Sequence, residues 1–428
     1  MVQKFGGMTF LIPYFIFVVL VGSTGVIEEF ALGRWAQGGP VIAFGKATES
    51  RTGKKSLGEA IGAIPIIGSM MLAIGYTVVM SWIFKYCWMG ISGSLYALGT
   101  DMGNIGGTFG ATAPEADTLG EALGMMFGNG IFGIGNGVWL IVGLVVSLAI
   151  MAMGVGDGIE KANKIMMPLL FGLFVILAVY VCTLPGAAEG YKYIFTIKPE
   201  GLLNPQVWVF AFGQAFFSLS INGAGMLIYG SYMKKGENIL RHAGMTAVLD
   251  TLAALLAGFA ILPAVFAFGI DPTSGPQLMF VTLPQIFQQM PGGRIFALLF
   301  FVSVFFAGIT SLMNMLEACG EALTSTFRLS RTVSTLLVGA AAFLPGLFLE
   351  SLAGMGSWMD LITIYVSPFG ALLVAVCIYF VLGMKGIRAE LALGRARAPG
   401  RLFGITARFY VFLTVAVWIL GIAYGGIG

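Results

Sequence analysis

Long apolar stretches separated by short polar segments are the dominant pattern along this chain. A helix of about 20 residues crosses the hydrocarbon core of a bilayer. Ten stretches come near or exceed that length: 9–33, 60–98, 134–154, 165–184, 206–232, 243–269, 295–326, 332–350, 359–383 and 405–426. The longest of them allow tilt or extension beyond the bilayer. The pattern predicts an all-α, polytopic membrane protein with about ten transmembrane helices.

The composition supports a chain surrounded by lipid. Of its 428 residues, 58% are hydrophobic and 10% are charged, whereas a soluble domain carries roughly a quarter charged residues. The four cysteines lie inside apolar stretches and show no disulfide or metal-ligand spacing. The one histidine, His242, lies in a basic loop, which argues against a zinc site or a Ser-His hydrolase. We therefore expect a multi-pass protein of the inner (plasma) membrane that is not an enzyme and binds no nucleic acid.

The loops alternate in charge along the chain. One set is cationic and holds Arg34, Lys46, Arg51, Lys54, Lys55, Lys161, Lys164, Lys234, Lys235, Arg241, Arg328, Arg331, Lys385, Arg388, Arg395, Arg397, Arg401 and Arg408. The other set holds Asp101, Glu115, Asp117, Glu121, Glu189 and Asp271. The positive-inside rule places the cationic set in the cytoplasm. Met1 would then lie outside, which fits either an N-out protein or a chain that lacks an opening helix.

Small and polar residues interrupt the fifth apolar stretch between Gly213 and Gly225. Glycine weakens a helix by about 1 kcal/mol relative to alanine, and Ser218, Ser220 and Asn222 add polar groups at mid-membrane. A broken helix would offer N–H groups to a substrate carboxylate and C=O groups to a cation. The alternative is that the small residues permit close helix packing. Both interpretations stay open from the residues alone.

Two further groups could bind a cation within the membrane. Asp250 lies in an apolar helix, where a carboxylate needs a cation, a proton or a structural hydrogen bond. Thr310 and Ser311 follow Ala307 by about one helical turn and could supply hydroxyl and carbonyl oxygens to Na+. Hydroxyls of this kind also bond back to their own helix, which is the alternative.

Four other polar side chains lie in apolar stretches. The Tyr76 hydroxyl needs a partner, which either a ligand or a neighbouring carbonyl could supply. Glu28, Glu29 and Glu317 are intramembrane carboxylates. Because they are consecutive, Glu28 and Glu29 cannot face the same side of a helix.

Taken together, these segments resemble the neurotransmitter:sodium symporter family, whose bacterial leucine transporter gives the fold its name. The resemblance runs the length of the chain and rests on 7–14 (GMTFLIPY), 29–34 (EFALGR), 213–232, 261–267 (ILPAVFA) and 307–311 (AGITS). It implies an inverted-repeat, leucine-transporter-like fold, in which 1–204 would be the rest of the first repeat, 205–384 the second repeat and 385–428 a cytoplasmic loop and the last helix.

The resemblance also implies a role for individual residues. Substrate-binding residues would be Tyr76, Phe217, Ser218, Ser220, Gly223, Ser311 and Met315. Ser218 and Asp250 would bind a first Na+, and Ala307, Thr310 and Ser311 a second. Asp360 matches half of an extracellular charge gate, Glu29 supports the broken helix, and Gln214 belongs to the region where chloride-dependent relatives bind chloride.

The chain departs from the family pattern in two places. The family's broken first helix has no counterpart here, since residues 1–7 align with the loop that follows it, so the apolar stretches would be family helices 2–11. The cytoplasmic gate aspartate is replaced by Ser325. A missing opening segment of about 30 residues would also resolve the orientation of Met1.

The implied function is sodium-coupled symport of a neutral amino acid by alternating access, with no organic cofactor. Asp250 supplies a fixed negative charge and Ala254 lacks a hydroxyl, so we expect no chloride requirement. Gly223 and Ala224 stand where bulkier groups narrow the pocket, which favours a large apolar or aromatic substrate. The alternatives are a truncated member that folds without transporting, and a channel, for which the sequence shows no filter motif. The substrate's identity and the oligomeric state are not predicted.

Overall fold

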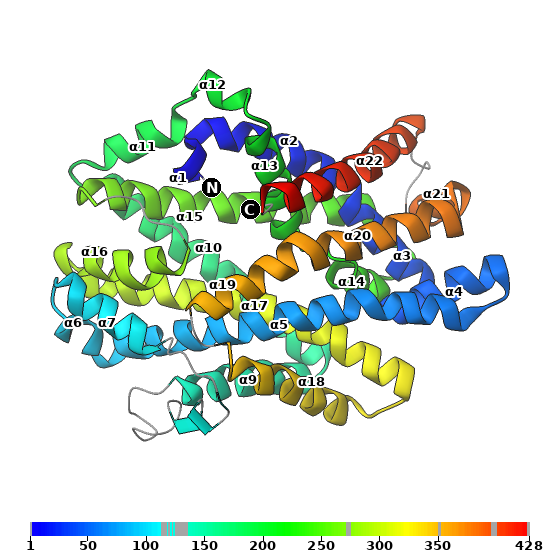
Figure 1. Cartoon of the computed structure of the whole chain (residues 1–428), viewed down its shortest axis with the longest axis horizontal. Coiled ribbons are helices and arrows are strands. Elements are labelled where there is room, and N and C mark those ends of the chain that lie inside the picture. The colour runs from blue at the N-terminus through cyan, green and yellow to red at the C-terminus, as the bar shows by residue number, and fades with distance from the viewer. Residues whose placement is uncertain are drawn as a thin grey trace.

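The structure is a computed structural model that describes residues 2–112, 118, 120–121, 123–124, 136–270, 275–349, 352–394 and 400–425. Within these residues all regular structure is helical. Five charged residues used above to predict orientation lie outside the described residues: Glu115, Asp117, Asp271, Arg395 and Arg397. Most of the long helices run side by side along the long axis of the molecule (Figure 1).

The first half of the chain forms the first four predicted spans. Its helices are α1 (Val2–Phe5), α2 (Gly7–Gly22), α3 (Gly25–Ala36), α4 (Pro40–Thr52), α5 (Lys55–Ser92), α6 (Ser94–Ala97), α7 (Met102–Thr112), α9 (Gly137–Ala152), the π-helical η1 (Val155–Glu160), α10 (Lys161–Cys182), α11 (Ala187–Phe195) and α12 (Pro199–Leu202). The span predicted at 9–33 is interrupted between α2 and α3. Helix α4 was not predicted as a separate element; Pro40 begins it and Gly53 ends it at φ 70°.

The second half supplies the other six predicted spans. Its helices are α13 (Pro205–Ser218), α14 (Gly225–Tyr232), α15 (Ile239–Ala267), η2 (Leu278–Thr282), α16 (Leu283–Gln289), α17 (Gly293–Phe327), α18 (Arg331–Gly346), α19 (Leu352–Leu361), η3 (Ile362–Val366), α20 (Ser367–Val376), η4 (Cys377–Leu382), α21 (Met384–Ala392) and α22 (Arg401–Tyr424). Helices α19 to η4 form one nearly continuous rod. The all-α, multi-pass prediction is confirmed.

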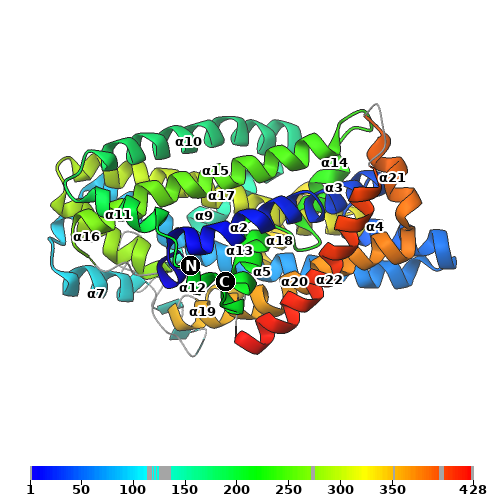
Figure 2. The ribbon, with the colours of Figure 1, turned by 90° about the horizontal axis from the view of Figure 1, so that it is seen from above.

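Seven of the described helical segments are long and apolar enough to cross a bilayer, and the apolar α9 is shorter. One predicted span, 206–232, is divided into α13 and α14. The described cationic loops gather at one end of the bundle, which holds the C-terminal ends of α3 and α17 together with α4 and α21 (right side of Figure 1). We name this the cationic end. In Figure 2, α21 lies across the ends of the other helices there.

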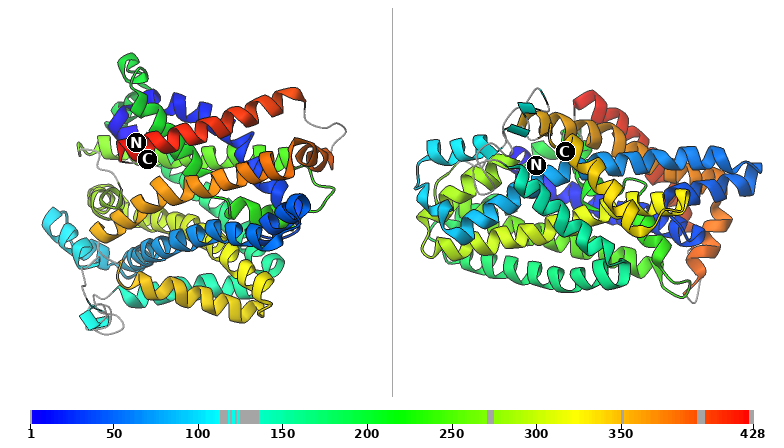
Figure 3. Two further views of the ribbon diagram at one scale, coloured as in Figure 1. Left: turned by 45° about the vertical axis from the view of Figure 1, so that its right-hand side comes forward. Right: turned by 90° about the horizontal axis from the view of Figure 1, so that it is seen from below.

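Most buried hydrophobic residues belong to two parts of the core, and a small third cluster consists of Ala224, Ile228 and Ala318. One part is built on α5, α9, α10 and α17, and the other on α2, α3, α13, α20 and α22. Figure 3 shows the same side-by-side bundle from two further directions. Helices α3 and α14 approach so closely that a Cβ on Gly33 would lie 1.9 Å from the Leu227 carbonyl oxygen. This contact fixes the half-helix α14 to α3 and so positions one side of the site.

Candidate functional site

The helix predicted at 206–232 is broken at the middle of the bundle. Helix α13 ends at Ser218 and α14 begins at Gly225. Two residues between them, Ser220 at φ 54° and Gly223 at φ 82°, have left-handed backbone conformations that end a helix. The Asn222 Oδ1 atom accepts the N–H groups of Ala224 at 3.0 Å and Gly225 at 3.1 Å, which caps the start of α14. The sequence left two interpretations of the small and polar residues between Gly213 and Gly225, a broken helix or close helix packing. The structure contains the broken helix.

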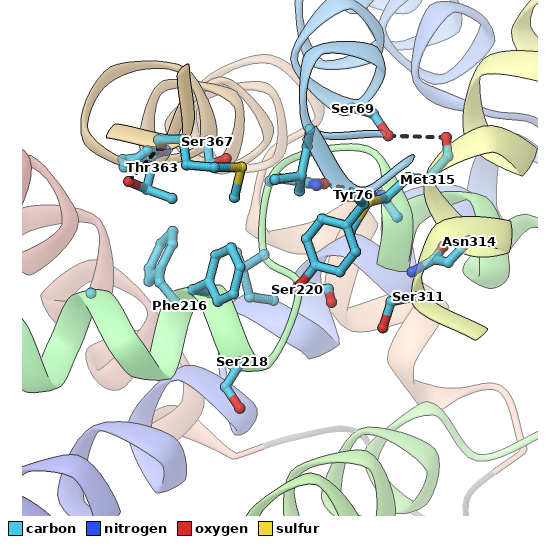
Figure 4. A pocket seen from close by; sticks show the side chains of 18 of the residues that line it. Ser69, Tyr76, Phe216, Ser218, Ser220, Ser311, Asn314, Met315, Thr363 and Ser367 are labelled. Carbon is cyan, nitrogen blue, oxygen red and sulfur yellow. Dashed lines mark hydrogen bonds between the residues drawn. The ribbon is translucent and has the colours of Figure 1, made fainter. Parts of the chain in front are cut away.

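A cavity of about 420 Å³ opens beside this break. It is lined from α5 by Ser69, Leu72 and Tyr76, from α13 and the break by Gly213, Gln214, Phe216, Phe217, Ser218, Ser220, Ile221, Asn222 and Gly225, from α17 by Ser311, Asn314 and Met315, and from α19 to α20 by Met359, Asp360, Thr363, Ser367 and Pro368. Figure 4 shows Tyr76, Ser220, Ser311 and Asn314 around this space. The structure therefore brings most of the predicted substrate-binding residues together, along with Gln214 and Asp360.

Gly223 is the exception among the predicted substrate-binding residues, because it does not line the cavity. A Cβ on it would lie 2.5 Å from the Gly370 carbonyl oxygen and 3.1 Å from the Pro65 Cβ. Its neighbour Ala224 is buried against Ile228 and Ala318. Backbone packing, and not free pocket width, accounts for the small residues at both positions, so the size of the substrate has to be argued from other side chains.

Ser218 connects the cavity to Asp250. Its hydroxyl donates a hydrogen bond of 2.6 Å to Asp250 Oδ2, and the Tyr14 hydroxyl lies 3.5 Å from Ser218 Oγ. Asp250 is half-buried and has no cationic partner among the described residues. A carboxylate and two hydroxyls are hard oxygen ligands of the kind that Na+ prefers. The donor set at this position fits a monovalent cation.

The other predicted cation ligands lie on α17. The Thr310 hydroxyl donates to the carbonyls of Phe306 at 3.0 Å and Ala307 at 2.9 Å, and the Ser311 hydroxyl donates to Ala307 at 3.0 Å. These hydroxyls therefore bond to carbonyls of their own helix, which was the alternative to cation binding. This bonding uses the hydroxyl protons and leaves oxygen lone pairs free, so the same atoms can still face a cation.

Glu29 holds the break from the side of α3. Its Oε1 atom accepts the N–H of Gly223 at 2.8 Å, while its Oε2 atom is buried and has no hydrogen-bond partner within the described parts of the chain. The preceding residue, Glu28, points to a different neighbour, the hydroxyl of Tyr379 on η4. The two consecutive carboxylates therefore face different surroundings, as the sequence predicted.

The third intramembrane carboxylate, Glu317, has an ion pair. Arg331 donates to both of its oxygens, at 3.1 and 2.8 Å, and Tyr232 donates to Oε1 at 2.7 Å. Arg331 also donates to the carbonyl of Met151 at 2.8 Å. This network joins α9, α14, α17 and α18 at the cationic end. Ser325, at the predicted gate position, donates to the carbonyl of Ala322 at 3.4 Å.

Sequence reasoning missed four polar residues that line the cavity, Ser69, Asn314, Thr363 and Ser367. Asn314 follows Ser311 by three residues on α17, and its Oδ1 atom is buried without a partner among the described residues. Thr363 and Ser367 are spaced by four in the rod that contains η3 and α20. A helical period of polar residues inside an apolar stretch is the signal that could have found them.

Comparison with known proteins agrees with this geometry. The sequence model of the sodium:neurotransmitter symporter family matches residues 118–421. The sodium-dependent transporter YhdH of Bacillus subtilis is 30% identical over 434 residues, covering 97% of this chain and 90% of its own length. The human sodium- and chloride-dependent GABA transporter 2 is 27% identical over 423 residues, covering 89% and 68%.

A solved structure shows the same likeness in three dimensions. The crystal structure of MhsT in complex with L-phenylalanine superposes with a TM-score of 0.83 at 29% identity, covering 98% of this chain and 92% of MhsT. The family consists of secondary transporters and not of enzymes, which agrees with a broken helix beside a cavity and an unpaired carboxylate. The chain belongs to the sodium:neurotransmitter symporter family.

Proposed function

We propose that this protein couples the entry of Na+ to the uptake of a neutral amino acid with a large apolar or aromatic side chain across the cytoplasmic membrane. One observation carries the proposal: the break between α13 and α14 opens into the cavity of about 420 Å³ directly beside the Ser218–Asp250 pair. The amino acid and the Na+ ion can therefore bind at adjoining ends of one interrupted helix.

The proposed site would bind groups of opposite charge at the two half-helices, a substrate carboxylate at α14 and a cation at the end of α13. The N-terminal end of α14 lies beside the cavity, and its positive dipole end would attract a substrate carboxylate. Tyr76 lines the same cavity and could donate its hydroxyl to that carboxylate. Ser218 and Asp250 would hold one Na+, and Ala307, Thr310 and Ser311 a second. When bound, the ions would supply positive charge that offsets Asp250 and the substrate carboxylate.

The substrate class follows from the apolar part of the lining. Leu72, Phe216, Ile221, Met315 and Met359 surround the cavity together with Phe217, and such surfaces favour an apolar side chain. The likeness to MhsT, whose structure contains L-phenylalanine, is in line with this class. Asp250 provides a fixed negative charge beside Ser218, and we infer that chloride is not required.

Uptake by proteoliposomes tests the proposal. Purified protein is reconstituted, an inward Na+ gradient is imposed, and labelled L-phenylalanine, L-leucine and glycine are compared, with choline replacing Na+ and gluconate replacing chloride. We expect Na+-dependent uptake of the two larger amino acids that gluconate does not change. The Asp250→Asn variant should lose uptake, while Asp157→Asn, an exposed residue paired with Lys161, should retain it.

Two results would contradict the proposal. Competition by glycine alone would exclude the large apolar substrate, and at least tenfold stimulation by chloride at constant Na+ would exclude chloride independence. A folded protein that binds no amino acid and shows no uptake would favour the alternative of a family member that folds but does not transport.

A further inference from the structure

Glu28 is a buried carboxyl group that the proposed transport site does not use. It lies on α3 with 2% of its surface exposed, one residue before the carboxylate that holds the broken helix. Among the described residues its one hydrogen-bond donor is the Tyr379 hydroxyl, and no lysine, arginine or histidine is within salt-bridge distance. A carboxylate in such a place is very costly if it is charged and unpaired.

Nearby charges do not remove this cost. The titratable groups that act on Glu28 are Glu29 on α3, Tyr379 on η4 and Tyr410 on α22; all three are neutral or negative. Charged groups on the other packed elements do not pair with Glu28: Glu390 of α21 pairs with Arg34, Asp250 of α15 bonds Ser218, and Lys46 of α4 bonds the Ala36 carbonyl. Arg388 of α21 has a buried Nε atom without a partner among the described residues, and it forms no ion pair with Glu28. Arg34 itself, on α3, directs its donors to Glu390 and Glu237.

We propose that Glu28 is a proton-binding site: its carboxyl group is neutral in this conformation, and it exchanges one proton with water when the cationic end opens. The proton is the ligand that removes the charge while leaving Oε1 free to accept the Tyr379 hydrogen bond. Arg34, at the cationic end, lies six residues further along α3, which is about 9 Å at the rise of a helix. Opening of that end would therefore bring water near Glu28.

The position of Glu28 gives the proton an influence on the transport site. If Glu28 ionised, its negative charge would lie beside the carboxyl group of Glu29, whose Oε1 holds the Gly223 N–H in the break. A charge next to a carboxyl group shifts its protonation equilibrium, so loss of the Glu28 proton would alter how Glu29 binds the Gly223 N–H. This coupling rests on the proposed function, whereas the protonation of Glu28 does not.

Infrared difference spectroscopy of the purified protein tests the proton site directly. At neutral pH the wild type should show the C=O stretch of a protonated carboxyl that is lost in Glu28→Gln. Tyr379→Phe removes the hydrogen bond to that carbonyl and should move the band to higher frequency, which provides a second readout if Glu28→Gln folds poorly. Glu59→Gln is the matched control, since Glu59 is partly exposed and pairs with Lys55; it should leave the band unchanged.

Identical carboxyl bands in the wild type and Glu28→Gln would show that Glu28 is ionised and overturn the proposal, as would a band that Tyr379→Phe does not move. A trapped pH indicator in proteoliposomes tests the exchange. Na+-driven uptake should be accompanied by proton efflux that is smaller in Glu28→Gln; equal efflux in both would overturn exchange at Glu28. A complete lack of uptake would count against the proposed function, and the infrared band would still decide the proton site.

Discussion

The guanidinium of Arg34 is bound to Glu390 by two separate hydrogen bonds. Arg34 Nε lies 2.5 Å from Glu390 Oε1, and Nη2 lies 2.6 Å from the carbonyl oxygen of the same residue. The remaining Nη1 atom donates to the Glu237 carbonyl at 2.5 Å, and the arginine has no exposed surface. One side chain thus joins the end of α3, the segment between α14 and α15, and the transverse helix α21.

Removing either partner of this pair should destabilise the protein strongly. Breaking a buried ion pair leaves an uncompensated charge and costs about 3–5 kcal/mol, so Arg34→Met and Glu390→Gln should each lower the thermal unfolding temperature clearly. The double variant should cost less than the sum of the two. The control is the partly exposed i,i+4 pair of Lys55 and Glu59, where replacing the two charged residues should have little effect on the unfolding temperature. Strictly additive losses of stability at Arg34 and Glu390 would show that the two residues do not interact.

The close approach of α3 and α14 predicts the effect of a single methyl group. Gly33→Ala would place a Cβ 1.9 Å from the Leu227 carbonyl oxygen and 2.8 Å from the Ser231 nitrogen. The helices would have to separate, at a cost of about 1–3 kcal/mol, and transport should fall because α14 carries one end of the break. Gly172→Ala on α10, where no described atom lies within 4 Å, should not lower the unfolding temperature. Equal behaviour of the two variants would contradict the packing argument.

Asp250 should determine how much Na+ the protein needs. Removing its charge in Asp250→Asn leaves the Ser218 hydroxyl with a neutral acceptor and weakens cation binding, so half-maximal Na+ for any residual substrate binding should rise at least about tenfold, the effect of 1.4 kcal/mol. Scintillation-proximity or equilibrium binding of labelled substrate over a series of Na+ concentrations measures this. An unchanged Na+ dependence would place the cation elsewhere.

Met315 should control the size of the substrate. It lines the cavity from α17, and Met315→Trp would fill part of the space that a large side chain needs. We expect competition by L-phenylalanine to weaken by about 10–200-fold, the range for pocket fits that differ by small groups, while competition by L-alanine is retained. Equal loss for both amino acids would mean that the variant damages the site as a whole.

Several features of the fold could be predicted because they depend on local sequence. The membrane spans could be predicted from the length of the apolar stretches. The break could be predicted between Gly213 and Gly225 because glycine, serine and asparagine are weak helix formers. Tyr76, Ser218 and Met315 were assigned to one pocket only through the family resemblance, since they lie on three separate helices. No local pattern would have brought them together.

Other features depend on distant packing and could not be predicted. Arg34 and Glu390 are 356 positions apart; Arg34 was considered only as a loop charge, and no sequence pattern pointed to Glu390. Gly223 was assigned to the pocket wall, yet its neighbour in space is Gly370, on the rod that forms the opposite side of the break. The partner of Glu317 was equally hidden, because Arg331 belongs to the next helix and was counted only toward orientation.

Ser218 has a place in the molecule that two ligands would have to share. Its hydroxyl lines the cavity and at the same time donates to Asp250, and it is the last residue of α13. Any molecule that draws this hydroxyl toward the cavity takes a hydrogen bond from the carboxylate, and any ion at the carboxylate reorients the same hydroxyl. Thermodynamic reciprocity then requires each ligand to change the affinity of the other by the same factor. A single oxygen atom would thus make the two binding equilibria inseparable.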